Sequence, residues 1–150
     1  MSLDSAADAA VDEAILDVEQ QLSVLFNRSR AVWKEAAEHV HPELQPAGYK
    51  LFGTIVRLGE TNAQVLSQMF DMDKSAVSRQ VRTLEEFGLV ESRADERDGR
   101  ARVLVPTALG LERARDVREA NKSRLRVALK GHSPEDLRVF ADILAAISAA

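Results

Sequence analysis

Two short predicted helices and a predicted β-hairpin, consecutive in the middle of the chain, constrain its fold most. The first helix is expected to run to Phe70, with Thr61 as N-cap and Gln64 three residues later, the spacing of a capping box. The second helix is expected to begin after the N-cap Asp73 and to close at Gly88, since glycine tolerates the left-handed conformation. Two helices this short, joined by a tight turn, predict a helix-turn-helix.

The second predicted helix has two distinct faces. At about 100° per residue, apolar side chains share one side, and an arc of roughly 140° carries cations and hydroxyls but no acid. Such an arc suits a DNA major groove, where arginine and lysine read guanine edges and serine reaches a base or a phosphate. An ordinary solvated face explains this helix alone equally well. The residues of the polar arc are Lys74, Ser75, Ser78, Arg79 and Arg82.

A β-hairpin is expected directly after the second helix. Its strands are predicted over Leu89–Arg93 and Arg102–Val105, with Pro106 ending the second one. Asp98 and Gly99, between them, form a dipeptide typical of hairpin turns. A helix-turn-helix followed by such a hairpin is a winged helix, so the predicted fold is mainly α with a small β-hairpin.

The hairpin tip carries charges that fit a wing. Arg97 and Arg100 lie near the tip, where a wing meets the DNA backbone or a minor groove. Asp95 and Asp98 are expected to orient the wing, holding these arginines through ion pairs. A solvated loop of mixed charge is the alternative, but the position directly after the second helix favours a wing.

These segments resemble the MarR (multiple antibiotic resistance regulator) family of bacterial winged-helix transcription factors. The resemblance implies a dimeric DNA-binding regulator, with small aromatic or phenolic effectors bound between the dimer-forming helices and the DNA-binding lobe. Pro106 departs from the family, which more often has leucine before the threonine. The resemblance is carried by Ser75–Arg79, Leu84–Val90, the D-x-R-D-x-R wing Asp95–Arg100, and Leu104–Gly110.

The rest of the chain is predicted to be helical. A long helix is expected from Asp12 to about His39, and another from Gln45 to about Leu58. Thr107 is expected to cap a helix that runs to about Lys130, and Ser133 the last helix. The arginines of the helix after Thr107 are expected to form a solvated face paired with acids of the same helix.

The terminal helices carry more apolar surface than a small winged helix can cover. The simplest way to bury this surface is a homodimer built from residues 12–40 and 108–150, with residues 45–106 as the DNA-binding lobe. A two-fold dimer predicts an inverted-repeat operator on double-stranded DNA. The resemblance implies an effector pocket, for which Phe26, Trp33, Tyr49 and Phe52 are candidates. A purely structural role in the core is the alternative for Trp33.

Composition excludes several other functions. The formal net charge of −4 does not favour general attraction to nucleic acid, so the DNA hypothesis depends on where the charges lie. The absence of cysteine excludes disulfides and thiolate metal sites. No apolar run approaches the roughly 18 residues of a membrane span, and the first ten residues are acidic and unlike a signal peptide, so a cytoplasmic protein is expected.

Little in the sequence points to catalysis or a cofactor. His39, His41 and Glu43 form a poor set of metal ligands, and no catalytic triad order or phosphate loop is present, so we expect no metal, cofactor or enzyme activity. Two hypotheses stay open. The first is a dimeric sequence-specific regulator, a repressor released by a small ligand; the second is a helical protein–protein adaptor whose winged helix reads no DNA.

Overall fold

A computed structural model describes residues 3–99 and 101–149 of the 150-residue chain. In that part of the chain the fold is mainly helical, with one antiparallel β-hairpin, which confirms the predicted fold class. The elements are α1 (Leu3–Val40), α2 (Pro46–Leu58), α3 (Ala63–Phe70), α4 (Lys74–Glu86), β1 (Val90–Ala94), β2 (Arg102–Pro106), α5 (Ala108–Ala128) and α6 (Pro134–Ala149).

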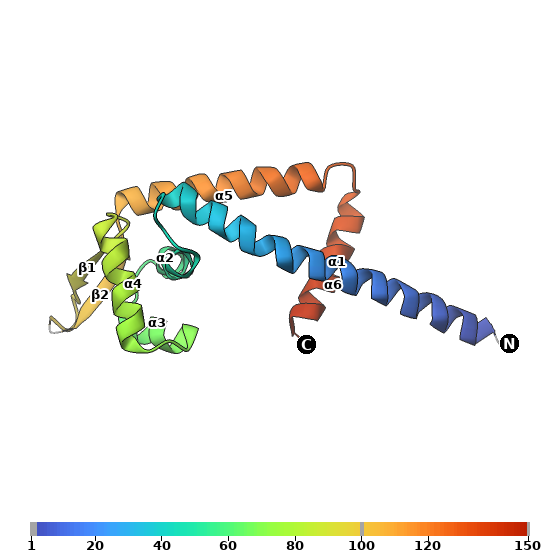
Figure 1. The fold of residues 1–150 in the computed structure, drawn as a ribbon, viewed down its shortest axis with the longest axis horizontal. Coiled ribbons are helices and arrows are strands. Elements are labelled where there is room, and N and C mark those ends of the chain that lie inside the picture. The colour runs from blue at the N-terminus through green and yellow to red at the C-terminus, as the bar shows by residue number, and fades with distance from the viewer. Residues whose placement is uncertain (1–2, 100, 150) are drawn as a thin grey trace.

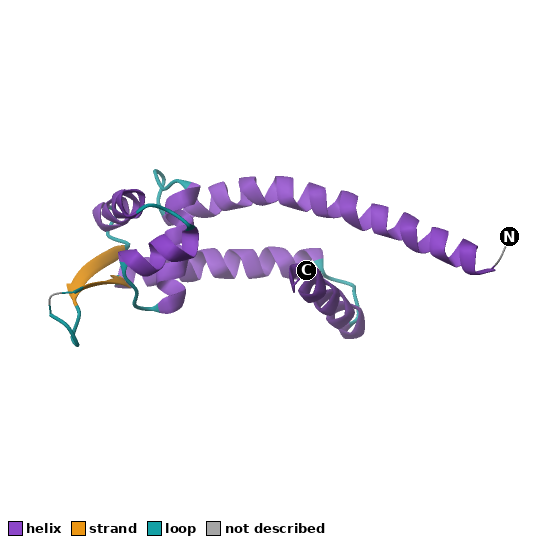
Figure 2. Ribbon diagram, turned by 90° about the horizontal axis from the view of Figure 1, so that it is seen from below, coloured by secondary structure: helices purple, strands orange, loops and turns teal. Residues whose placement is uncertain are grey.

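The molecule has a compact lobe at one end and long helices that leave it. Figure 1 shows α2, α3, α4 and the hairpin gathered in the lobe, while α1 and α5 extend away from it side by side. The last helix, α6, turns back from the far end of α5 and crosses α1 in that view. Figure 2, turned by 90°, shows that α6 lies well apart from α1. The terminal helices therefore project beyond the core of their own chain.

The lobe is built around α2. This helix contacts α1, α4, α5 and β2, and its residues Leu51, Phe52 and Ile55 are almost completely buried. Leu66 of α3 and Leu84 of α4 complete the same apolar cluster. Burying one such side chain contributes about 1.5–3 kcal/mol to stability, so this cluster holds the two short helices that could not form alone.

The backbone before α3 adds a third segment to the hairpin. Thr61 pairs with Leu104 of β2: its N–H donates to the Leu104 oxygen at 3.1 Å, and its own oxygen accepts from the Leu104 N–H at 2.7 Å. The prediction that Thr61 caps α3 is therefore wrong. Asn62 is the N-cap, and its side-chain oxygen accepts from the Val65 N–H at 2.9 Å. Sheet pairing outweighs the capping-box pattern because it uses both backbone groups of Thr61.

Several other predicted helix ends agree with the structure. Gln45 precedes α2, and Gly59 ends it with a φ of 75°. Gly88 follows α4 with a φ of 70°, as expected for a glycine in the left-handed region. Thr107 caps α5 by accepting the Gly110 N–H at 3.0 Å, and Ser133 caps α6 by accepting the Asp136 N–H at 3.1 Å.

Some boundaries differ from the prediction. The first helix begins at Leu3 rather than Asp12, because alanines sustain a helix and acids near its start favour the helix dipole. The first strand is displaced by one residue, to Val90–Ala94, since the Leu89 N–H still bonds back to Leu84 in the helix end. The helix after Thr107 ends at Ala128, slightly before the predicted Lys130.

An ion pair joins α1 to α5. The guanidinium of Arg124 donates to both carboxylate oxygens of Glu35, at 3.2 and 2.6 Å. This contact lowers the pKa of Glu35. The acids predicted to pair with the α5 arginines lie on α5 itself, whereas this partner of Arg124 lies on the neighbouring helix. The pairing therefore fixes the relative position of two long helices.

The apolar faces of α1 and α6 are uncovered. On α1, Ile15, Leu25 and Phe26 are at least half exposed, and no described residue of α6 is buried. The predicted α6 stripe is present, with Phe140 and Ile143 about half exposed. Among the described residues, no helix is both long and apolar enough to span a membrane. These faces are free to pack against another chain.

Gly110 tests the packing between the lobe and α5. A Cβ at this position would lie 2.1 Å from the Leu89 carbonyl oxygen, which is backbone and cannot move away cheaply. We expect Gly110→Ala to lower the free energy of unfolding by about 1–3 kcal/mol or more, as measured by urea denaturation. Gly53→Ala is the matched control, since a Cβ there meets nothing within 4 Å. It should leave stability unchanged or raise it by up to about 1 kcal/mol.

Candidate nucleic-acid interface

The start of α4 is held by Asp73. Its carboxylate accepts hydrogen bonds from the Ser75 hydroxyl and from the Ala76 N–H, the latter at 2.7 Å. These two bonds, the Ser75 bond first, lower the pKa of Asp73 below its usual range. The N-cap predicted from the sequence is thus present, and it orients Ser75 on the first turn of the helix.

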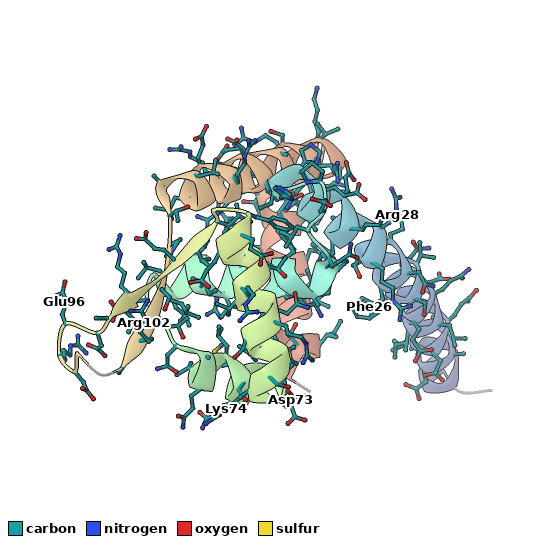
Figure 3. The ribbon with its side chains drawn as sticks, turned by 60° about the vertical axis from the view of Figure 1, so that its left-hand side comes forward. Phe26, Arg28, Asp73, Lys74, Glu96 and Arg102 are labelled. Atoms are coloured by element: carbon teal, nitrogen blue, oxygen red, sulfur yellow. The ribbon has the colours of Figure 1, made fainter. Side chains whose placement is uncertain are left out.

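The two faces of α4 are arranged as predicted. Val77, Val81 and Leu84 are buried against the lobe. The five residues of the predicted polar arc are all exposed, and the Arg79 guanidinium donates to the Ser75 hydroxyl at 3.4 Å. Figure 3 shows Asp73 and Lys74 at the free end of the helix. The lobe therefore presents one exposed cationic, hydroxyl-bearing face without an acid between its cations.

The turn between α3 and α4 contains an interaction that sequence reasoning missed. Asp71 adopts a left-handed φ of 49°, which aspartate tolerates better than most residues. The Ser67 hydroxyl donates to the Met72 oxygen at 2.6 Å, and the Met72 N–H donates back to the Ser67 oxygen at 3.1 Å. This pair of bonds fixes the angle between the two helices.

The hairpin loop is ordered by its backbone. Asp95 accepts the Arg97 N–H at 2.8 Å through its carboxylate, so it orients the loop as an Asx turn. Asp95 was expected to hold an arginine side chain, and its contact with Arg97 is instead to the main chain. The side chains of Arg97 and Asp98 are exposed. Arg100 lies outside the described residues.

Two further arginines lie on the strands of the hairpin. Arg102, at the start of β2, donates through Nε to the Ser92 hydroxyl at 3.0 Å and through Nη2 to the Ser92 carbonyl oxygen at 2.6 Å. Arg93 forms an ion pair with Glu91, which lies two residues earlier on the same face of β1. The sequence places an arginine in β2, but only the register shows that it reaches across to β1.

The four aromatic residues predicted to line one pocket are not brought together. Trp33 lines a hollow of about 550 Å³, and the Lys50 ammonium lies 4.4 Å from its ring centroid. Tyr49 and Phe52 line a second hollow of about 270 Å³ beside α5. Phe26 is 65% exposed on α1, where Figure 3 labels it, and it lines neither hollow. The lining of the larger hollow is Arg30, Trp33, Pro46, Ala47, Lys50, Leu51, Phe70 and Met72.

The histidines near the end of α1 have structural contacts. His41 stacks on Phe87 with ring centroids 3.7 Å apart, and its Nδ1 lies 3.3 Å from the Glu43 N–H. His39 Nδ1 lies 3.1 Å from the Glu35 carbonyl oxygen. In residues 3–99 and 101–149 no group of three His, Asp or Glu side chains is placed to hold a metal ion.

Comparison with known proteins assigns this lobe. Residues 44–101, from the start of α2 through the hairpin loop, match the model of the MarR family. This part of the chain therefore resembles the MarR family. The chain is 26% identical over 127 residues to an uncharacterized HTH-type transcriptional regulator, YxaD, of Bacillus subtilis, covering 85% of this chain and 87% of that one. The match confirms the predicted resemblance, and the relative that covers most of this chain is described as a transcriptional regulator.

Two other MarR-like proteins illustrate the range of similarity. The regulator PetP of Rhodobacter capsulatus is 35% identical over 82 residues, 55% of this chain and 49% of PetP. The structure of Streptococcus pneumoniae FabT in complex with DNA superimposes with a TM-score of 0.76 at 17% identity, over 90% of this chain and 95% of FabT. At that identity, the FabT likeness establishes the winged-helix fold.

Asp73 gives α4 a stability that depends on pH. Its pKa is lowered from the ordinary value of 3.8 by hydrogen bonds from Ser75 and Ala76, which form only in the folded state. The stabilisation is therefore fully present above about pH 4 and is lost as the pH falls through the lowered pKa. We expect Asp73→Ala to lower the unfolding midpoint at pH 7 more than at pH 3, in thermal melts followed by circular dichroism. If Asp73→Ala lowered the unfolding midpoint equally at pH 7 and pH 3, the role of the ionised carboxylate would be contradicted.

Proposed function

We propose that this MarR-like protein is a homodimeric, sequence-specific regulator of double-stranded DNA that inserts α4 into the major groove. The observation that carries the proposal is the exposed face of α4, whose cations and hydroxyls lie without an acid between them beside an exposed hairpin. Arg79 and Ser78 read base edges on this face, while Lys74, Ser75 and Arg82 contact phosphates or bases. The chain acts on chromosomal DNA in the cytoplasm.

The hairpin serves as the wing. Arg97 enters a minor groove beside the site read by α4, where narrow A·T-rich grooves concentrate negative potential. Asp95 orients the loop rather than touching DNA, because it accepts the Arg97 N–H and a carboxylate would be repelled by phosphate. Arg100 and Asp98 belong to the same D-x-R-D-x-R sequence and take the corresponding roles on the other side of the turn.

A second copy covers the terminal helices. The apolar faces of α1 and α6 are uncovered in the protomer and are continuous with the helices that support the lobe. Residues 7–27 of α1 contain acids and no lysine or arginine, whereas α5 is rich in arginine, so the faces of two copies are complementary in charge. A two-fold dimer presents two α4 helices to successive major grooves, which requires an inverted-repeat operator.

The dimer is a repressor that a small aromatic ligand releases. The larger hollow supports this proposal, because it adjoins α1, the start of α2 and the α3–α4 turn. Trp33 and Phe70 offer flat apolar contacts, while Arg30 and Lys50 offer positive charge. This combination favours a phenolate or an aryl carboxylate. Burial raises the pKa of Tyr49, so in the smaller hollow the phenol stays protonated at neutral pH.

A helical adaptor that reads no DNA remains the second candidate. The net charge of −4 favours it, since the protein as a whole repels a polyanion. The two candidates differ in one measurement. A regulator binds the intergenic DNA beside its own gene more tightly than random DNA and loses affinity as salt rises, whereas an adaptor shows neither property.

Arg79 tests the readout of bases. Arg79→Ala should weaken binding to the operator by about 1–3 kcal/mol and relax base preference, as expected for loss of a paired contact to a base. Arg28→Ala, an exposed cation of α1 outside the lobe, is the control and should leave affinity unchanged. Fluorescence anisotropy on operator and random duplexes measures both. Equal weakening on the two duplexes would mean that Arg79 contacts phosphate only.

Leu144 and Ile147 test the dimer. The double substitution to Asp places charges in the apolar stripe of α6 and should yield monomers or unfolded chains in sedimentation velocity. Ala149→Asp, on the opposite side of the same helix, should leave the dimer intact. A stable monomer of the unaltered protein at micromolar concentration would contradict this arrangement.

The Trp33 hollow predicts a direct binding signal. Because Trp33 is the sole tryptophan, titration with 4-hydroxybenzoate should quench its fluorescence and release DNA over the same concentration range. Lys50→Met should weaken the quenching, since it removes a cation beside the ring. Tyr49→Phe, in the smaller hollow, should not. The reverse pattern would place the ligand beside α5.

A further inference from the structure

One face of the hairpin continues from the core of the lobe toward DNA. Val90 and Leu104 are buried in the same cluster as Leu84 of α4, so their side of the sheet faces that helix. Side chains two residues apart share a face of a strand. Ser92 and Arg102 therefore lie on this inner face, one step further toward the tip than the last buried residues.

Arg102 is held in place on that face while its charge stays exposed. Two of its N–H groups donate to the hydroxyl and carbonyl oxygens of Ser92. A guanidinium has five N–H donors in a fixed plane, so three can serve other acceptors. Its side chain is exposed to solvent. A side chain already ordered in this way loses less conformational freedom when it binds a ligand.

The position of Arg102 indicates which acceptor its remaining N–H groups can bind. Figure 3 places it between Glu96 at the hairpin tip and the helix that begins at Lys74. With α4 in a major groove and the tip in the adjacent minor groove, the sugar–phosphate strand that separates the two grooves runs through this corner. We propose that Arg102 binds a phosphate of that strand and fixes the distance between wing and recognition helix. This inference rests on the proposed function.

The neighbouring Arg93 serves as an internal control for Arg102. It lies on the outer face of the same hairpin, one pleat away from Ser92, and pairs there with Glu91. Its charge is compensated and faces away from α4. The two arginines therefore differ in face and partner but share the same small sheet, so Arg93 is the matched control for Arg102.

The experiment is a salt titration with the full chain on the intergenic duplex and on a random duplex. Each phosphate contact contributes a slope of about −0.9 to log affinity against log salt. Arg102→Ala should reduce the slope by about that amount per protomer on both duplexes, because a phosphate contact carries no base preference. Arg93→Ala should leave the slope unchanged. Circular dichroism melts report whether each variant keeps the fold.

Two conservative variants separate contact from support. Arg102→Lys keeps the charge but loses the planar fork of N–H donors, so it should keep the slope and weaken affinity. Ser92→Ala should do the same, since it removes the hydroxyl acceptor of Arg102 and leaves only the carbonyl oxygen to hold the guanidinium. An Arg102→Ala protein that binds with an unaltered slope would overturn the inference and leave the proposed function standing. Absence of salt-sensitive binding by the unaltered protein would overturn the proposed function itself.

Discussion

The close approach of α5 to the end of α4 is the contact on which the arrangement of the molecule depends. Leu89 follows the end of α4, and its carbonyl oxygen accepts the Thr107 N–H at 3.0 Å. The Thr107 hydroxyl donates to the neighbouring Gly88 oxygen. Gly110 then passes so near Leu89 that no side chain fits between them. This junction joins the end of α4 and the start of the hairpin directly to α5.

The larger hollow lies where a ligand would act on the lobe. Its walls come from α1, from the start of α2 and from the turn that sets the angle between α3 and α4. Ser67 and Met72 fix that turn with two hydrogen bonds. A ligand that separates Trp33 from Lys50 would alter how α1 meets α2, and so the spacing of two lobes in a dimer. Such a change would leave the internal structure of α4 as it is.

Local placement of charge, not total charge, explains how an acidic protein can bind a polyanion. The Debye length at physiological salt is about 8 Å, so the acids of the first half of α1 have little influence on the exposed face of α4. Two acids of the candidate interface have other roles. Asp73 is engaged in capping the helix, and Asp95 in ordering the loop.

The sequence by itself determined what is local. The polar arc of α4, its cap Asp73 and the left-handed Gly88 follow from helical periodicity and from backbone preferences, which act within a few residues. The hairpin follows from its turn dipeptide for the same reason. The resemblance to the MarR family adds to this list because Asp95–Arg100 is a contiguous motif.

Tertiary structure alone decided what depends on distant partners. Thr61 has the sequence of a helix cap but pairs with Leu104, 43 residues later, because a sheet edge there uses both of its backbone groups. Trp33 and Tyr49 belong to separate hollows, since Trp33 lies on α1 beside the start of α2, whereas Tyr49 lies on the side of α2 that meets α5. Arg102 reaches Ser92 only through the hairpin register. Each of these contacts is set by packing between elements, which no local pattern records.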